Sequence, residues 1–413
     1  MIKSSEKKGQ FFILYFFLFC SIILKNMYSI LTKISSFLVC AMVGSLVIGC
    51  KSTKVEVVEA GWTIQQEMTV NAKLKTMTLE EKVCQMFILE PEVINGDCYN
   101  CSEDFLQKYV KDPVGGFIFF NRNLQNYSQV KKFISDLQKV SISISGVPLF
   151  MCVDEEGGRV CRIARNEEFF QSNSNIKNVG PMSEIKTRKD SYNAGLTVGC
   201  YLAEMGFNWD FAPVVDVVEN ESGPIGNRSF GNNPAKVSEL AAGFAKGLTE
   251  NKVMSCYKHF PGHGAVTGDT HNELNATEKT LEDLLNWDMI PYTNAKSNGI
   301  GAIMVSHISI PKISGDNTPA SLCYQDLGAI LLEKMEFEGL VITDALNMKA
   351  VSSYYTSGEA AVLAIQAGND LLLMPQNYRE ARESVLTAVK SGQITEERIN
   401  FSVRKILLWK INL

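Results

Sequence analysis

Short apolar runs alternate with amphipathic segments along most of the chain. Segments such as 126–140, 233–251 and 358–368 place apolar residues three and four positions apart, which predicts helices. Eight shorter runs rich in apolar and β-branched residues predict strands: Val83–Glu90, Gly115–Phe120, Val147–Asp154, Phe207–Asp216, Lys252–His259, Gly301–Ile308, Gly339–Asp344 and Asn369–Met374. Strands that are apolar throughout and are each followed by a helix indicate a parallel sheet covered by helices.

Eight such units favour a single-domain (β/α)8 barrel over the alternative, an open doubly wound sheet. Ionisable side chains stand at the C-terminal ends of five predicted strands, and they are Asp154, Asp216, Lys258 with His259, His307 and Asp344. Barrel enzymes keep their active sites at that end of the strands. No linker rich in Pro, Gly or Ser divides residues 61–413. We therefore expect one α/β catalytic domain over this range.

The first 49 residues differ from the rest. They hold two apolar runs, 11–24 and 37–49, each shorter than the ~20 residues of a spanning helix. The second run ends in Val47-Ile48-Gly49-Cys50, which resembles a bacterial lipobox. We expect a signal peptide over 1–49, with a start at Met27 as a second option, an acylated Cys50 and a polar tether over 50–60. The alternative is an uncleaved N-terminal anchor. Either arrangement places the body in the cell envelope, facing the periplasm or the exterior and tethered to membrane lipid.

Composition excludes several classes of protein. The chain of 413 residues is 46% hydrophobic and 21% charged, which is typical of globular proteins and not of disordered, collagen-like or coiled-coil chains. With 40 Lys and Arg against 45 Asp and Glu, the net charge is −5, so no basic surface is expected for nucleic acid. We expect a monomer.

Eleven cysteines are present, eight of them after Cys50, and most of these eight lie in apolar runs typical of buried thiols. Cys98 and Cys101 instead lie in a polar loop without a second Cys-x-x-Cys or a nearby histidine, so a zinc site is not predicted. A local disulfide and two plain loop residues both remain open for this pair.

The four histidines all lie between His259 and His307. Three of them fall in KHFPGHGAVTGDTH, Lys258–His271, which glycines and a proline make too irregular for a helix. His259 and His263 are therefore not the paired zinc ligands of a metallopeptidase helix. A metal site built from several loops is the alternative to a site without metal.

Two further strings carry candidate chemistry. Asp344 closes the predicted strand GLVITD, and a desolvated acid there is either functional or the N-cap of the next helix. In VDEEGGRVCR, two glycines permit a tight turn that Asp154, Arg159 and Arg162 bracket.

Together these strings resemble glycoside hydrolase family 3, in its branch of single-domain bacterial β-N-acetylglucosaminidases. KHFPGHG followed by Asp-x-His is the most specific match, and DEEGGRVCR, FAPVVDV, GNRSFG, VITDALNM and AGNDLLLMP support it. The resemblance runs from about Met77 to about Leu408. The strings depart from the family at Glu155, where glutamine is common, and in HNELN after His271, where a proline is often found downstream.

The resemblance implies a role for each matching residue. Asp344 would be the nucleophile and His271 the general acid/base, with Asp269 orienting the imidazole ring. Arg159 would be structural, and no cofactor or metal would be needed. The residues that would bind hydroxyls of the terminal sugar are Asp154, Arg162, Arg228, Lys258 and His259.

The implied activity is that of a retaining exo-β-N-acetylglucosaminidase acting on terminal N-acetylhexosamines of peptidoglycan or chitin-type fragments through a covalent glycosyl-aspartate. Alternatives within the family are a β-glucosidase or β-xylosidase and a glycosidase that uses phosphate. A sugar-binding lipoprotein without catalysis would lose His271 or Asp344, and both are present.

Overall fold

The computed structural model describes residues 62–96, 99–264, 266, 268, 270, 273–411 and 413. These residues belong to one structural unit. The leader, Cys50, the tether, Cys98, Asp269 and His271 lie outside the described residues. In the described part of the chain, no helix combines the length and the apolar character needed to cross a membrane.

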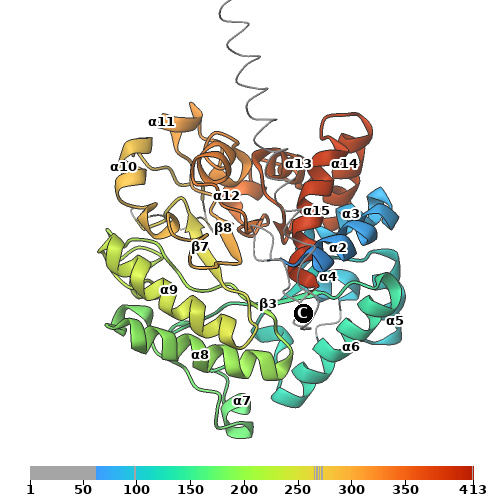
Figure 1. Ribbon diagram of the computed structural model, residues 1–413, viewed down its shortest axis with the longest axis horizontal. Helices are drawn as coiled ribbons and strands as arrows, with labels where there is room; N and C mark the ends of the chain where they lie inside the picture. Colours follow the sequence, from blue (N-terminus) through green and yellow to red (C-terminus); the bar gives the residue numbers. More distant parts are fainter. Residues whose placement is uncertain are drawn as a thin grey trace, which may run out of the picture. The chain divides into compact units, whose positions relative to one another are not determined.

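Two parallel sheets form the centre of the molecule (Figure 1). The first has the strand order β10-β1-β2-β3-β6 and the second the order β7-β8-β9. Their bounds are β1 (Phe87–Leu89), β2 (Gly116–Phe119), β3 (Phe150–Val153), β6 (Trp209–Asp210), β7 (Cys256–Phe260), β8 (Ala302–Val305), β9 (Leu340–Thr343) and β10 (Leu372–Leu373). Each lies within one of the eight runs predicted as strands or, for β7, overlaps it. The α/β class and the parallel sheet are thus confirmed.

Isolated parallel bridges connect the two sheets. Trp209 of β6 pairs with Met254 just before β7, and Ile342 of β9 pairs with Leu371 just before β10. The amide of Asp210 donates to the Met254 carbonyl at 2.9 Å, and that of Thr343 donates to the Leu371 carbonyl at 3.1 Å. Both edges of the three-stranded sheet therefore contact the five-stranded sheet.

Helices surround these strands (Figure 1). Their bounds are α2 (Ile64–Thr76), α3 (Leu79–Gln85), α4 (Glu92–Asn95), α5 (Glu103–Lys111), α6 (Tyr127–Ser145), α7 (Glu167–Ser172), α8 (Arg188–Met205), α9 (Pro234–Glu250), α10 (Leu281–Asn286), α11 (Pro311–Ser314), α12 (Lys349–Ser352), α13 (Ser357–Ala367), α14 (Tyr378–Lys390) and α15 (Glu396–Lys410). A π-helix covers Gly328–Lys334.

The three helices predicted from periodicity begin at clear capping signals. The Asn126 side chain accepts from the Gln129 amide at 3.0 Å and starts α6, and Asn233 followed by Pro234 starts α9 in the same way. Thr356 and Glu359 form a capping box at α13. Such caps satisfy amides that have no partner inside the helix.

Two strand predictions need correction. The run Val83–Glu90 begins as helix, because Thr78 and Glu81 form a capping box that starts α3, and only Phe87–Leu89 is a strand. The run Phe207–Asp216 is a strand only at Trp209–Asp210. Beyond Asp210 the run makes only an isolated parallel bridge, between Val214 and Lys258, and Pro213 has no amide hydrogen to donate to a sheet ladder.

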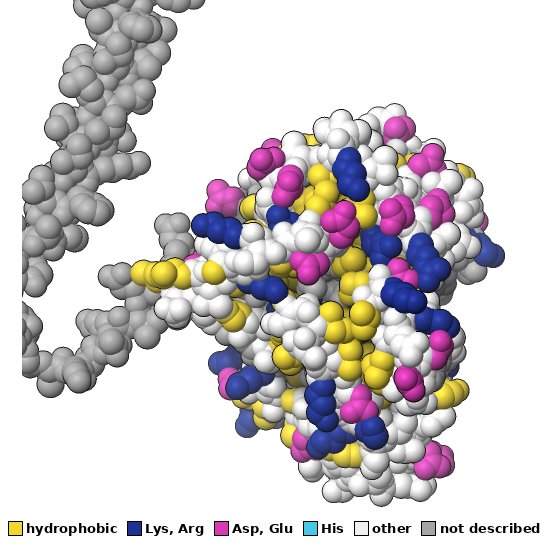
Figure 2. Space-filling view, turned by 90° about the vertical axis from the view of Figure 1, so that its right-hand side faces the viewer, with side chains coloured by type: hydrophobic (Ala, Val, Ile, Leu, Met, Phe, Trp, Pro, Cys, Tyr) yellow, Lys and Arg dark blue, Asp and Glu magenta, His cyan; other side chains and the backbone are white. Residues whose placement is uncertain are grey.

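The cysteines and the surface charges lie as the composition predicts. Five cysteines are buried as expected, and they are Cys84, Cys152, Cys161, Cys256 and Cys323. Cys98 lies outside the described residues, so its pairing with Cys101 stays a prediction. Figure 2 shows basic and acidic side chains interspersed over one face, the pattern expected of a chain with a small net charge.

Candidate active site

A cavity of about 320 Å³ lies at the C-terminal ends of the strands. Its walls include the ends of β3, β7 and β9 and the segments that follow them. Six residues predicted to handle substrate all line this cavity, and they are Asp154, Arg162, Arg228, Lys258, His259 and Asp344. The fold thus gathers side chains that are far apart in the sequence.

A short antiparallel hairpin after β3 shapes one wall. It consists of β4 (Glu155–Gly157) and β5 (Val160–Cys161); Gly157 ends β4 and Gly158 lies in the turn, with φ of +89° and +57°. The buried carboxylate of Glu155 accepts the backbone amides of Arg162, Ile163 and Ala164 at 2.6, 3.0 and 2.9 Å. Glu155 therefore fixes the return of the hairpin.

That return brings Arg162 back toward the end of β3. Its Nη2 lies 3.7 Å from Oδ2 of Asp154. The neighbouring arginine, Arg159, turns away and donates to the carbonyls of Pro224 and Ile225. This contact holds the loop that carries Arg228, which agrees with the structural role expected for Arg159.

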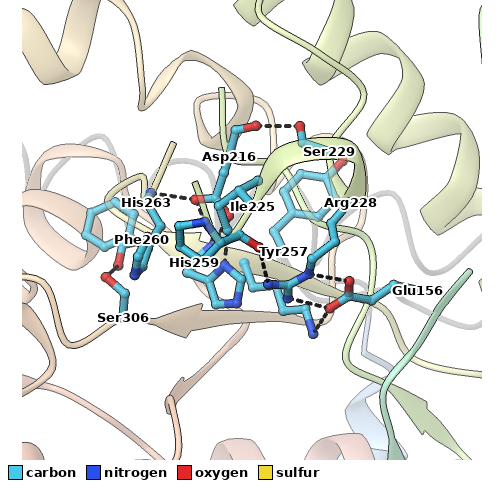
Figure 3. A network of polar contacts seen from close by, with 12 residues as sticks. Glu156, Asp216, Ile225, Arg228, Ser229, Tyr257, His259, Phe260, His263 and Ser306 are labelled. Atoms are coloured by element: carbon cyan, nitrogen blue, oxygen red, sulfur yellow. Dashed lines mark hydrogen bonds and ion pairs between the residues drawn. The ribbon is translucent and has the colours of Figure 1, made fainter. Parts of the chain in front are cut away.

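Glu156 is a central residue of the site that the sequence reasoning missed. Its side chain is 1% exposed, and its carboxylate accepts from Nε and Nη2 of Arg228 at 2.8 and 2.7 Å (Figure 3). The ammonium of Lys258 lies 2.7 Å from the same carboxylate. Burial acts to raise the pKa of Glu156, but the charges of Arg228 and Lys258 outweigh it and hold this pKa below its usual value.

Lys258 joins this pair to Asp154. Its Nζ lies 2.8 Å from Oδ1 of Asp154, and its side chain is 3% exposed. Although burial acts to lower the pKa of Lys258, Asp154 and Glu156 raise it above its usual value, so the ammonium stays charged. Four side chains thus form one network of two carboxylates and two cations.

His259 follows Lys258 directly, yet both line the cavity. The pairing of β7 with β8 shifts register between Lys258 and Phe260, an irregularity of the kind that redirects side chains. Nδ1 of His259 lies 2.7 Å from Oδ2 of Asp216, which is fully buried. With Nδ1 engaged there, the other ring nitrogen remains for other partners.

Asp344 follows β9 directly. Its amide donates to the Val305 carbonyl at 2.8 Å, and its Oδ1 accepts from the Ala345 amide at 2.8 Å. The next helix, α12, begins at Lys349 with Met348 in the N-cap position. Asp344 is therefore not that N-cap, and the capping alternative is wrong.

His307 does not line the cavity, and its Nδ1 and Nε2 lie 2.7 and 3.0 Å from Ser321 Oγ and the Ala345 carbonyl. Asp269 and His271 are not described, but Thr270 between them lines the cavity. Within the described ranges, no three side chains of His, Cys, Asp or Glu are grouped to hold a metal ion.

Known proteins resemble the chain over most of its length. The family model described as glycosyl hydrolase family 3 N terminal domain matches residues 78–408. The curated "Beta-hexosaminidase A" of Pseudoalteromonas piscicida is 30% identical over 73% of this chain and 54% of that protein. A "Beta-hexosaminidase" of Neisseria meningitidis serogroup B is 31% identical over 69% of this chain and 78% of that protein. This chain therefore spans about half the length of the first relative and about three quarters of the second.

A solved structure shows the same fold. The glycoside hydrolase family 3 β-N-acetylglucosaminidase from Paenibacillus sp. is similar with a TM-score of 0.73 and 31% identity. The match covers 81% of this chain and 62% of that protein.

Proposed function

The chain belongs to glycoside hydrolase family 3, and from that membership we propose that it is a retaining exo-β-N-acetylglucosaminidase that removes terminal N-acetylhexosamines. The observation that carries the proposal is the cavity that Asp344 lines together with Asp154, Arg228 and Lys258, the last two held by the buried Glu156. Relatives named β-hexosaminidase support the same activity.

In this proposal, Asp344 attacks the anomeric carbon and forms a covalent glycosyl-enzyme. His271 protonates the departing oxygen and then takes a proton from the attacking water, with Asp269 orienting its ring. A histidine suits both steps because its usual pKa is near neutrality. This part rests on the sequence motif, and it is supported by the place of Thr270 in the cavity wall.

The remaining cavity residues bind the sugar. Diols need paired donors and acceptors, and the Lys258 ammonium beside the Asp154 carboxylate supplies such a pair at 2.8 Å. Arg228 is held by Glu156 with its guanidinium in a fixed plane, which suits it to donate to hydroxyls. His259 is oriented by Asp216, and Arg162 reaches the same wall from the hairpin.

We further propose that the two sheets are parts of one closed (β/α)8 barrel in a single domain over residues 61–413. The bridges from Trp209 to Met254 and from Ile342 to Leu371 support closure, since an open sheet keeps two free edges. The gathering of ionisable groups at the C-terminal strand ends also favours a barrel.

The location and the natural substrate are part of the proposal too. Val47-Ile48-Gly49-Cys50 supports acylation of Cys50 after removal of residues 1–49, and two acyl chains give stable membrane anchoring. An anchored enzyme facing outward would meet fragments of peptidoglycan or chitin. Labelled palmitate should enter the native protein but not Cys50→Ala. A native protein found soluble with its first 49 residues intact would contradict this.

The activity is tested with aryl β-glycosides of N-acetylglucosamine, glucose and xylose, using the full-length chain in detergent with and without phosphate. We expect N-acetylglucosamine to be released fastest, independently of phosphate, and NMR to show the β-anomer first. First release of the α-anomer, a preference for glucoside or xyloside, or formation of a sugar phosphate would each overturn the proposal.

A further inference from the structure

Thr270 stands between the two residues to which the proposed function assigns proton transfer, Asp269 and His271. Its side chain lines the cavity, and the residue is only 2% exposed. A buried threonine in an irregular loop needs partners for its polar atoms. Those partners show how the chain is held at this point.

Thr270 is tied to two parts of the site. Its Oγ1 lies 3.2 Å from Nε2 of His263, and its carbonyl accepts the Ala350 amide at 3.3 Å. His263 follows β7, and Ala350 lies in α12, six residues after Asp344. The loop is therefore connected both to the sugar-binding strand and to the segment that follows the proposed nucleophile.

His263 is itself fixed by Asp216. The His263 amide donates to Oδ1 of Asp216 at 2.6 Å, and its ring lies 6.0 Å from that of His259 (Figure 3). The same carboxylate accepts the His259 amide and lies 2.7 Å from His259 Nδ1. Burial acts to raise the pKa of Asp216, but His259 lowers it below its usual value, so the carboxylate stays ionised.

Gly264, near the start of the loop, packs closely against the chain that follows Asp216. A Cβ added at Gly264 would lie 1.8 Å from the Val217 carbonyl, so only glycine allows this approach to the chain after Asp216. The Glu219 amide donates to the Gly264 carbonyl at 3.1 Å. Gly264 and Thr270, two described residues of this stretch, are thus both held by contacts with their surroundings.

From these contacts we infer that Thr270 is a positioning residue, which sets the chain between Asp269 and His271 through His263 and Asp216. One buried carboxylate, Asp216, then orients both the sugar-binding His259 and, through His263 and Thr270, the proton donor. The inference rests on the proposed function for the roles of His271 and His259. That Thr270 is held through His263 and Asp216 does not depend on the proposed function.

The consequence for catalysis depends on the leaving group. General acid catalysis contributes about 10²–10⁴-fold, and a displacement of ~1 Å can cost about 10²-fold. A poor leaving group needs the proton in the transition state, whereas an activated one leaves without it. Loss of the contact between the Thr270 hydroxyl and His263 should therefore lower kcat/KM mainly for substrates with poor leaving groups.

The test compares Thr270→Val, which keeps the shape but removes the hydroxyl, with Thr270→Ser, which keeps the hydroxyl. Thr197→Val is the matched control, because the half-buried Thr197 on α8 also makes one hydrogen bond through its hydroxyl, to the Asn193 carbonyl at 2.9 Å, but this bond lies at the protein surface. All are made in the full-length chain. The readouts are kcat/KM on a dinitrophenyl and on a methyl β-N-acetylglucosaminide, and hydrogen exchange of the peptide covering residues 265–275.

For Thr270→Val we expect a loss of about 30-fold or more on the methyl glycoside, under about 3-fold on the dinitrophenyl glycoside, and faster exchange in the peptide. Thr270→Ser should recover most of the loss, and Thr197→Val should behave as the native chain. Equal losses on both substrates, or unchanged exchange in Thr270→Val, would overturn the inference. A native enzyme inactive on both substrates would refute the proposed function instead. In that case hydrogen exchange of the peptide 265–275 would by itself test whether the Thr270 hydroxyl holds the chain in place.

Discussion

Replacing Glu156 by glutamine tests whether the buried Glu156 carboxylate holds Arg228 and Lys258 in place in the sugar site. The change keeps the size of the side chain and removes its charge. Glu156 accepts two N–H groups from Arg228 and forms an ion pair with the Lys258 ammonium. A glutamine amide offers one acceptor oxygen and turns an NH2 group toward these cations, so at least one contact becomes repulsive.

The magnitude follows from burial. Removing one partner of a buried ion pair costs about 3–5 kcal/mol, because the other charge stays desolvated. Unfolding entropy of about 2.1 cal/mol/K per residue gives roughly 0.7 kcal/mol/K for a unit of ~350 residues, so a loss of ~3 kcal/mol lowers Tm by about 4 °C. Because Arg228 and Lys258 lose their common anchor, kcat/KM should fall by about 10²-fold.

Glu338→Gln is the matched control. Glu338 lies 2.7 Å from Lys296, the same distance as that between Glu156 and Lys258, but both partners are 49% exposed. Exposed pairs contribute about 0–1 kcal/mol. This variant should therefore keep its Tm within about 1 °C and its native activity.

The pH dependence gives a second check. The pKa of Glu156 is lowered in the folded chain, so its stabilisation is present above the unfolded pKa and is lost only as pH falls through the lower folded pKa. The gap between native protein and Glu156→Gln, measured by thermal and urea unfolding, should thus be the same at pH 7 and pH 6. Equal Tm values for Glu156→Gln and Glu338→Gln at pH 7 would refute the reasoning.

Three further predictions concern other parts of the molecule. Asp344→Asn should lower kcat by about 10³-fold or more with little change in Tm, because an amide oxygen can still accept from the Ala345 amide; substantial activity in this variant would contradict a nucleophilic role. Burial lowers the pKa of Lys410 to about 7, so the folded chain binds fewer protons than the unfolded chain above that pH. The native chain should therefore gain up to about 1.4 kcal/mol per pH unit relative to Lys410→Met between pH 7 and 9 in urea unfolding, and a constant difference would argue against this. Dialysis against a strong chelator should leave glycosidase activity intact, and a loss restored by zinc would show a metal requirement.

The sequence predicted the strands well, because a buried parallel strand leaves an uninterrupted apolar run such as GLVITD. It failed at Val83–Glu90, where the same apolar composition forms the buried side of α3. Only the capping signal of Thr78 and Glu81 distinguishes the two. The hairpin Glu155–Cys161 was foreseen as a turn but not as paired strands.

Residues of the candidate site could be predicted where a sequence motif contains them. They could not be predicted where adjacent residues make different contacts. Glu155 and Glu156 are adjacent acids, yet one fixes the hairpin backbone and the other holds Arg228 and Lys258. Their directions depend on the hairpin geometry, which composition does not encode. The connection from Asp216 through His263 to Thr270 likewise depends on the path of an irregular loop.

The most direct test of the central claim is covalent trapping of the glycosyl-enzyme. The protein is incubated with a fluorinated N-acetylglucosaminyl fluoride that reacts quickly but is released slowly, then digested and mapped by mass spectrometry. We expect one added sugar per chain, on the peptide containing Asp344, and no adduct in Asp344→Asn. An adduct on any other residue, or turnover without an adduct on Asp344, would contradict it.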